Sequence, residues 1–492
     1  MSTDPCGRLP SWRASASSRR PPGRGDPRKP PHRSVVPKDR PSAIIVGPAS
    51  GGDAPTATPL GRPVTIIRAL RKIPLPTAPA ACSALRGGMT PTAMRPGMTP
   101  TAGSRATPAR RSALLVVRAL SVTLLAVVAL TVALAATPPT AGAITRGMVD
   151  DRWVRADEAT REAILTEYSK RLRVQVVRVT IQWPKAEPER GQYDEAYLAK
   201  IENGIIAARR HKIRVMIMVY QTPKWASDQR FWNSPPSPQI EKGYQTFYPI
   251  RRNNLADFRR FAKMLAGRFQ GRVTWYECWC EPNLATYLYP QQYRGDKHFA
   301  SRTYARYLQA FYKGIKAGYR KAAVLGGVTG PWGKNNRWST SPQRFARHLK
   351  ALKAWRWFDG YSHHPYPVGG IPPAPNRRPR FPQYTVSLYN ARTLLRVFPK
   401  TQFYFTEYGY TTKAVKVFGG GRVSPARQAK YLTMAYRMAD RLPRVRMLLW
   451  LQWKDTPPAA GKPSNLGHYF GLRYANGKRK QSWYRYARLY RQ

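Results

Sequence analysis

The sequence predicts an α/β protein in which residues 144–492 form a (β/α)8 barrel. Three observations predict this fold. Eight short apolar runs follow one another along this part of the chain, amphipathic helical periods fill the gaps, and no Gly-x-Gly-x-x-Gly follows the first run. The missing glycine motif argues against a doubly wound open sheet, which is the alternative. Eight strands alternating with helices are typical of the barrel.

The expected strands are short runs of β-branched and other apolar residues, bounded by turn-forming residues. They span 144–149, 174–182, 213–220, 273–280, 322–328, 358–364, 402–407 and 446–453.

Helices are expected between these runs, because apolar residues recur there at three- and four-residue spacing. Ser424 and Pro425 are typical of a helix start, as its cap and its first-turn residue. The apolar stripes are Ile164, Tyr168 and Leu172; Phe258, Phe261, Ala262, Leu265 and Phe269; Tyr304, Leu308, Phe311, Tyr312, Ile315 and Tyr319; and Tyr431, Leu432, Ala435 and Ala439.

Residues 1–112 are rich in Pro, Arg, Ala, Gly, Ser and Thr and have no sustained apolar period. Such a segment cannot bury enough surface to offset its chain entropy, so we expect it to be disordered. An alternative is that translation starts downstream, at Met89, Met94 or Met98, so that this region is not translated.

Residues 113–143 predict a signal peptide or a membrane anchor. The apolar run 119–136 follows Arg110 and Arg111 and precedes the small residues 141–143. A charged start, an apolar middle and an A-x-A site describe a secretory signal, while the length of the run also just suffices for an anchor. In both cases the barrel is expected outside the cytoplasm, secreted or membrane-anchored.

The predicted barrel region is strongly basic. Residues 144–492 hold 64 basic and 21 acidic residues, a formal charge of +43. Such a surface attracts polyanions at low salt, although a solvated surface without a ligand is the slightly favoured interpretation. No zinc-finger spacing, phosphate loop or RNA-binding motif accompanies the charge.

The cysteines predict neither a disulfide framework nor a metal site. Cys6 and Cys82 lie in the region expected to be disordered, and Cys278 and Cys280 lie two apart on one expected strand. That spacing puts both side chains on one face and disfavours a bridge between them. Since no His, Cys and Asp cluster has metal-ligand spacing, we predict no metal and no cofactor.

Two glutamates stand out as candidate catalytic residues. Glu281 and Glu407 each end an expected apolar strand, and only four acids lie between Lys297 and Gln492. A carboxylate at the end of a buried strand is costly unless it has partners or a task. Two of them on separate strands suggest a glycosidase, in which one acid protonates the leaving oxygen and the other attacks the sugar. The alternative for Glu407 is a structural ion pair with an arginine.

The sequence also resembles the clan A glycoside hydrolases, the retaining (β/α)8 group that includes cellulases and β-xylosidases. The resemblance spans nearly all of 144–492, and its strength lies in the order of several short motifs. They are Arg178 with Trp183 and 187–191, Thr222-Pro223-Lys224-Trp225, Cys280-Glu281-Pro282, 359–366 with His364 and Tyr366, Glu407, and Trp453-Lys454-Asp455.

The resemblance implies a role for each candidate residue. Glu281, two residues after Trp279, would be the acid/base with a raised pKa, and Glu407 would be the nucleophile. Arg178 and Tyr366 would hold Glu407 ionised. The other implied contacts are with the carbohydrate substrate: Trp225 and Trp453 would offer flat faces to the sugar, and His364 would orient it. Packing is as good an interpretation for Trp225 and for His364, and His363 is expected to be structural.

Cys280 departs from the family pattern, because the resemblance implies an asparagine that contacts the sugar 2-hydroxyl at this position. A thiol is a weak hydrogen-bonding group, and contacts to that hydroxyl strengthen in the transition state. The leading hypothesis is a retaining glycoside hydrolase acting on a β-glycoside or polysaccharide. The alternatives are a catalytically weak carbohydrate-binding barrel and an extracellular polyanion-binding protein.

Overall fold

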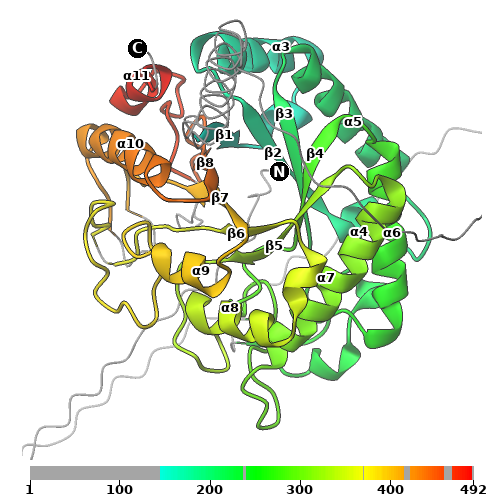
Figure 1. The fold of residues 1–492 in the computed structure, drawn as a ribbon. Helices are drawn as coiled ribbons and strands as arrows, with labels where there is room; N and C mark the ends of the chain where they lie inside the picture. Colours follow the sequence, from blue (N-terminus) through cyan, green and yellow to red (C-terminus); the bar gives the residue numbers. More distant parts are fainter. Residues whose placement is uncertain (1–143, 237–239, 370, 415–420, 459–467, 490–492) are drawn as a thin grey trace, which may run out of the picture. The chain divides into compact units, whose positions relative to one another are not determined.

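The computed structural model describes residues 144–236, 240–369, 371–414, 421–458 and 468–489. Within these ranges, eight parallel strands close into a barrel in chain order, with β8 paired to β1. Figure 1 shows the helices arranged around the strands. The predicted (β/α)8 fold is therefore confirmed. The segments 1–112 and 113–143 lie outside the described residues, and no helix within the described ranges is long and apolar enough to cross a bilayer.

All eight expected strands are present, with ends that differ by a few residues. They are β1 Thr145–Val149, β2 Val176–Gln182, β3 Arg214–Tyr220, β4 Val273–Cys278, β5 Ala323–Thr329, β6 Gly360–His363, β7 Gln402–Tyr408 and β8 Val445–Leu451.

The expected helical stripes also form helices. The longer ones are α3 Glu158–Thr166, α5 Glu195–Arg210, α6 Leu255–Arg268, α7 Phe299–Gly318, α8 Pro342–Ala351 and α10 Pro425–Asp440. The shorter ones are α2 Arg152–Arg155, α4 Trp183–Ala186, α9 Arg392–Val397 and α11 Gln481–Ala487. Single turns are the π-helical η1 Glu167–Arg171 and the 3-10 turns η2 Lys224–Ala226, η3 Gln229–Phe231, η4 Arg252–Asn254 and η5 Ala354–Trp357.

Local chemistry accounts for where these helices begin and how closely they pack. The hydroxyl of Ser424 accepts a hydrogen bond from the Arg427 N–H and caps α10, as predicted. Helices α6 and α7 touch through backbone, since a Cβ on Gly314 would lie 2.4 Å from the Arg259 carbonyl oxygen. Only glycine permits that approach.

Two apolar clusters build the core on the two sides of the strands. One fills the space between strands and helices, and the other lies inside the barrel. The inner cluster includes Val176 on β2, Trp275 on β4 and Leu449 on β8. Because side chains alternate along a strand, the neighbours two positions further on also face the barrel interior.

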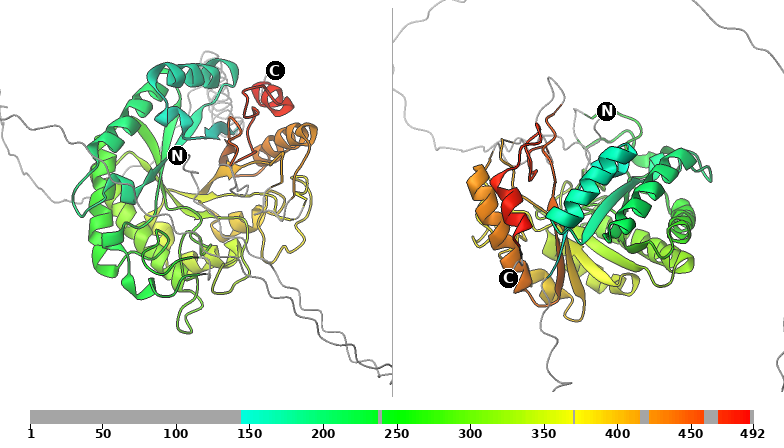
Figure 2. Two further views of the ribbon diagram at one scale, coloured as in Figure 1. Left: turned by 180° about the vertical axis from the view of Figure 1, so that it is seen from behind. Right: turned by 90° about the horizontal axis from the view of Figure 1, so that it is seen from above.

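Helix α11 packs next to the place where β1 pairs with β8 and closes the barrel. Both views in Figure 2 place α11 beside α10, and the Tyr436 and Tyr486 ring centroids lie 5.7 Å apart. The Tyr486 hydroxyl donates a hydrogen bond of 3.0 Å to the Gly147 carbonyl of β1. The C-terminal helix thus stabilises the closing pair of strands.

Candidate active site

Glu407 lies inside the barrel, fully buried, on β7. The pairing of β7 with β8 shifts register between Phe405 and Tyr408. Thr406 and Glu407 both make hydrogen bonds with residues of the barrel interior, although simple alternation would turn one of them outward. Such an irregularity is the usual way in which a strand redirects a side chain.

The contacts of Glu407 are those that a carboxylate needs to stay ionised. The Arg178 guanidinium of β2 donates from Nη2 to Oε1 and forms a buried ion pair with Glu407. The Tyr366 hydroxyl donates to Oε2 over 3.1 Å. The structure thus brings together the three residues that the sequence analysis grouped.

Glu281 faces Glu407 from the chain segment that follows β4, and only 6% of its surface is exposed. Burial raises the pKa of Glu281, the hydrogen bond and charge of His364 oppose this shift, and the charge of Glu407 adds to it. The net direction is upward, as expected for a group that must carry a proton near neutral pH.

Trp279, two residues before Glu281, packs on the helix side of the strands. Its indole N–H donates to the Tyr287 carbonyl over 2.8 Å, and its ring packs on Tyr307 with centroids 4.9 Å apart. Trp279 therefore packs among residues of the core between the strands and the helices α6 and α7. If the strand continued past Cys278, its alternation would put the side chains of Trp279 and Glu281 on one face. The chain instead turns at Trp279, whose φ is +73°.

That turn also corrects the expected length of the strand. Because β4 ends at Cys278, the prediction that Cys278 and Cys280 share a strand is wrong. Trp279 and Glu281 both have positive φ, a conformation that costs a non-glycine residue about 1–3 kcal/mol and that clusters at active sites. Cys280 lies between them, fully buried in the outer apolar cluster. Both cysteines are free thiols.

His364 lies between the two candidate carboxylates. Its Nδ1 is 2.9 Å from Glu281 Oε1 and 3.6 Å from Glu407 Oε2. Burial alone lowers the pKa of His364, but the charge of Glu407 and the hydrogen bond to Glu281 outweigh it, so the pKa is raised. The neighbouring His363 has a structural role, as expected, because its ring bonds to Thr329 and to the Val386 carbonyl.

Glu281, His364 and Glu407 together offer one ligand atom each within 4.8 Å of one another, which is close enough to hold a metal ion. The surrounding charges oppose this use. Arg178 is paired with Glu407, and the raised pKa of His364 favours the protonated ring, which cannot bind a metal. The arrangement suits proton transfer better than metal binding.

The two candidate sugar platforms are fixed by protein contacts. The Trp225 indole N–H donates to the Glu187 carbonyl over 3.1 Å, and its ring meets Trp183 edge to face at 5.4 Å. The Trp453 indole N–H donates to Glu167 over 3.2 Å. Both rings remain partly exposed, and their contact with a sugar stays a prediction.

Sequence reasoning missed a third buried carboxylate, Glu277 on β4. It accepts hydrogen bonds from Arg178 and from Ser362 in the barrel interior. The available signal was the alternation of side chains along β4. Trp275 faces the barrel interior, so Glu277, two residues later, should face it too.

Asn283 and Gly330 fix the chain around Glu281. The Asn283 side chain accepts from the Gly330 N–H over 2.8 Å and donates to the Thr340 carbonyl over 3.0 Å. A Cβ on Gly330 would lie 2.8 Å from the carboxyl carbon of Glu281. Glycine at this position therefore leaves the space that the carboxyl group occupies.

We expect Gly330→Ala to lower kcat about tenfold to a hundredfold on glycosides with poor leaving groups, because the added methyl group displaces Glu281. The control is Gly267→Ala in α6, where a Cβ meets nothing within 4 Å. Steady-state kinetics and melting temperatures of both variants check this. Equal kcat values in the two folded variants would contradict the steric argument.

The sequence matches the cellulase family model (glycosyl hydrolase family 5) over residues 138–366. The match includes Glu281, His364 and Tyr366 and ends before Glu407. No curated protein sequence matches the chain.

Several solved structures share the fold. A GH5_18 protein from Bifidobacterium longum subsp. longum, solved with Manβ1-4GlcNAc, is 15% identical with a TM-score of 0.51, over 70% of this chain and 77% of that chain. A GH5_18 protein from Bifidobacterium longum subsp. infantis is 15% identical with a TM-score of 0.51, over 70% of this chain and 78% of that chain.

A family 39 glycoside hydrolase from Bacteroides cellulosilyticus WH2 is 17% identical with a TM-score of 0.49, over 70% of this chain. This chain covers 62% of the length of that protein.

In its barrel fold and in the match over residues 138–366, this chain is similar to the glycoside hydrolases. The family match confirms the resemblance to the clan A glycoside hydrolases, and among their families it points to family 5. The family match supports a glycosidase function. The solved structures have low sequence identity and support the fold.

Proposed function

We propose that this protein is a retaining glycoside hydrolase that cleaves a β-linked glycoside or polysaccharide by double displacement. The observation that carries the proposal is the separation of the acid pair, since an oxygen of Glu281 and one of Glu407 lie within 4.8 Å of each other. Retaining enzymes have carboxyl groups about 5–5.5 Å apart, and inverting ones about 6.5–9.5 Å.

In the first step, Glu407 attacks the anomeric carbon and forms a glycosyl ester, while the glycosidic C–O bond breaks. Glu281 gives its proton to the leaving oxygen, a role that its raised pKa supports. In the second step, Glu281 takes a proton from water, the water oxygen bonds to the anomeric carbon, and Glu407 leaves as a carboxylate.

Arg178 and Tyr366 stabilise the carboxylate that attacks and later leaves. His364 lies within hydrogen-bonding distance of Glu281 and beside Glu407, so it can hold the transferable proton near both. This arrangement needs neither a cofactor nor a metal.

A panel of aryl glycosides tests the proposal, with proton NMR of the first product. The panel includes β-mannosides and 2-acetamido glucosides, since a neighbour of similar fold was solved with Manβ1-4GlcNAc. We expect the first-formed sugar to keep the anomeric configuration of the substrate. Inversion would contradict the mechanism. Saturable sugar binding without turnover would favour the weak carbohydrate-binding barrel, for which Cys280 is the main argument.

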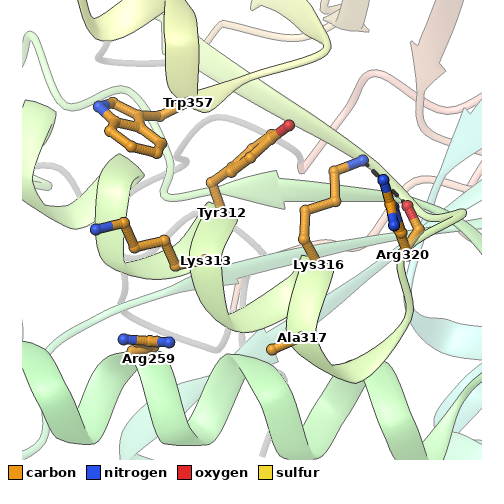
Figure 3. A pocket seen from close by; sticks show the side chains of 7 residues that line it. All are labelled: Arg259, Tyr312, Lys313, Lys316, Ala317, Arg320 and Trp357. Carbon is orange, nitrogen blue, oxygen red and sulfur yellow. Dashed lines mark hydrogen bonds between the residues drawn. The ribbon is translucent and has the colours of Figure 1, made fainter.

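A second candidate function, polyanion binding, is favoured by a basic hollow on the outside of the barrel. The hollow has a volume of 640 Å³ and lies against α6, α7 and η5 (Figure 3). Its lining residues are Arg259, Tyr312, Lys313, Lys316, Ala317, Arg320 and Trp357. Lys313 lies 5.1 Å from the Trp357 ring, so a cation and a flat aromatic face border the same space. Acidic polysaccharides carry anionic groups and sugar faces that fit such a lining.

We expect Lys313→Ala with Arg320→Ala to reduce the salt dependence of binding to an acidic polysaccharide, lowering the log–log slope by about two. The matched control is Arg437→Ala with Arg485→Ala, which removes the same charge at a hollow formed by α10 and α11. Affinity measured over a range of salt concentrations checks this. Equal loss in both double variants would show that net charge alone drives binding.

Export of the barrel is also a proposal. It rests on the apolar run 119–136, which lies outside the described residues. N-terminal sequencing of the native protein tests it, and a cytosolic chain retaining residues 113–143 would contradict it.

A further inference from the structure

We propose that Glu277 is a positioning residue that fixes the Arg178 guanidinium against Glu407. The inference rests on the proposed function, in which Glu407 is the nucleophile. Glu277 touches neither acid directly through a described hydrogen bond, and it acts through the arginine.

Both oxygens of Glu277 have partners in the barrel interior. Oε2 accepts from Arg178 Nη1 over 3.1 Å, and Oε1 accepts from the Ser362 hydroxyl over 2.5 Å. Glu277 and Ser362 are both fully buried. A carboxylate held at both oxygens in a dry interior has little freedom to rotate, so it is a fixed acceptor for the arginine.

The contacts continue around the barrel to the nucleophile. Ser362 on β6 lies 2.6 Å, hydroxyl to hydroxyl, from Thr406 on β7, and Thr406 directly precedes Glu407. Arg178 closes the network, because it forms ion pairs with both Glu407 and Glu277. The network joins β2, β4, β6 and β7, so each member is placed by two others.

The geometry of the guanidinium gives this network its consequence. Arginine presents its N–H groups in a rigid planar fork. Nη1 points to Glu277 and Nη2 to Glu407, so the two carboxylates set the plane of the fork together with His364, whose Nε2 lies 3.5 Å from Nη1. Without the Glu277 carboxylate, the guanidinium can rotate about its ion pair with Glu407. Its Nη2 then no longer holds a fixed direction toward Glu407. The Glu407 carboxylate then loses its fixed orientation toward the anomeric carbon.

The test is Glu277→Gln, which keeps the volume and the acceptor for Ser362 but turns an N–H group toward Arg178. We expect kcat to fall about tenfold to a hundredfold while KM stays within about twofold, because Glu277 does not touch the sugar. The matched variant Ser362→Ala removes the other partner of Glu277 and leaves the Arg178 ion pair. Since Ser362 holds one of the two oxygens of Glu277, kcat is also expected to fall in this variant, but by less than in Glu277→Gln.

Different results overturn this inference and the proposed function. Absence of turnover in the wild-type protein overturns the function. An active wild type with unchanged kcat in folded Glu277→Gln overturns only the role of Glu277. A crystal structure of the variant gives a readout that does not depend on activity, since an unmoved guanidinium would also contradict the inference. If Glu277→Gln does not fold, Glu277→Asp keeps the charge but shortens the reach, and an unchanged kcat there has the same meaning.

Discussion

Glu407→Ala is expected to abolish turnover, lowering kcat on the order of 10⁵-fold, because no described side chain can replace the attacking oxygen. Glu407 is fully buried and receives hydrogen bonds from Arg178 and Tyr366, which suits a carboxylate that attacks. Steady-state kinetics with the best glycoside of the panel measures the loss.

A loss of stability must be separated from this loss of chemistry. Removing Glu407 leaves Arg178 buried with Glu277 as its remaining described ion-pair partner, and breaking a buried pair costs about 3–5 kcal/mol. Glu407→Gln keeps the volume and should also be inactive. Glu195→Gln, at an exposed position in the first turn of α5, is the control for charge and should keep full activity. Near-normal kcat in folded Glu407→Gln would remove Glu407 from the mechanism.

Glu281→Ala is expected to lower kcat/KM about 10²–10⁴-fold on substrates with poor leaving groups. Substrates with good leaving groups should be spared in the glycosylation step, because they need little proton donation. Rates plotted against the leaving-group pKa measure this, and the variant should show a steeper dependence than the wild type. A uniform loss across the series would contradict the role of Glu281 as the acid.

The pH profile gives a second readout for Glu281. The acid works in its protonated form, so the wild-type rate falls as pH rises through its pKa, which burial raises. This alkaline fall should disappear in Glu281→Ala on substrates with good leaving groups. Its persistence would assign the titration to another group, of which His364 is the nearest candidate.

The fold could be predicted because the strands are short apolar runs and several of the longer helices carry an apolar stripe. The eight apolar runs correspond to the eight strands, and the Ser424 cap lies where the pattern placed it. Strand ends were less predictable. Nothing in the composition around Trp279 indicates a positive φ, yet that turn ends β4 and sends the indole to the outside of the barrel.

Part of the site could be predicted from local sequence features and from the family resemblance. Position at a strand end marked Glu281 and Glu407, and their partners Arg178, Tyr366 and His364 followed from the family resemblance. Glu277 was missed because its role depends on contacts between strands that are distant in sequence. The register shift in β7 was equally invisible, because two consecutive inward side chains contradict the alternation that the prediction uses.

Several contacts of the barrel join residues that are far apart in the sequence, so they can form only late in synthesis on the ribosome. The hydroxyl of Tyr486 bonds to β1, 339 residues earlier, and Glu407 meets Arg178 across 229 residues. A nascent chain that has emerged only as far as β6 already carries the proposed acid, Glu281, but not the proposed nucleophile, Glu407. Such long-range pairings form late and slowly. Under the proposed mechanism, the chain therefore cannot turn over substrate before β7 has been synthesised.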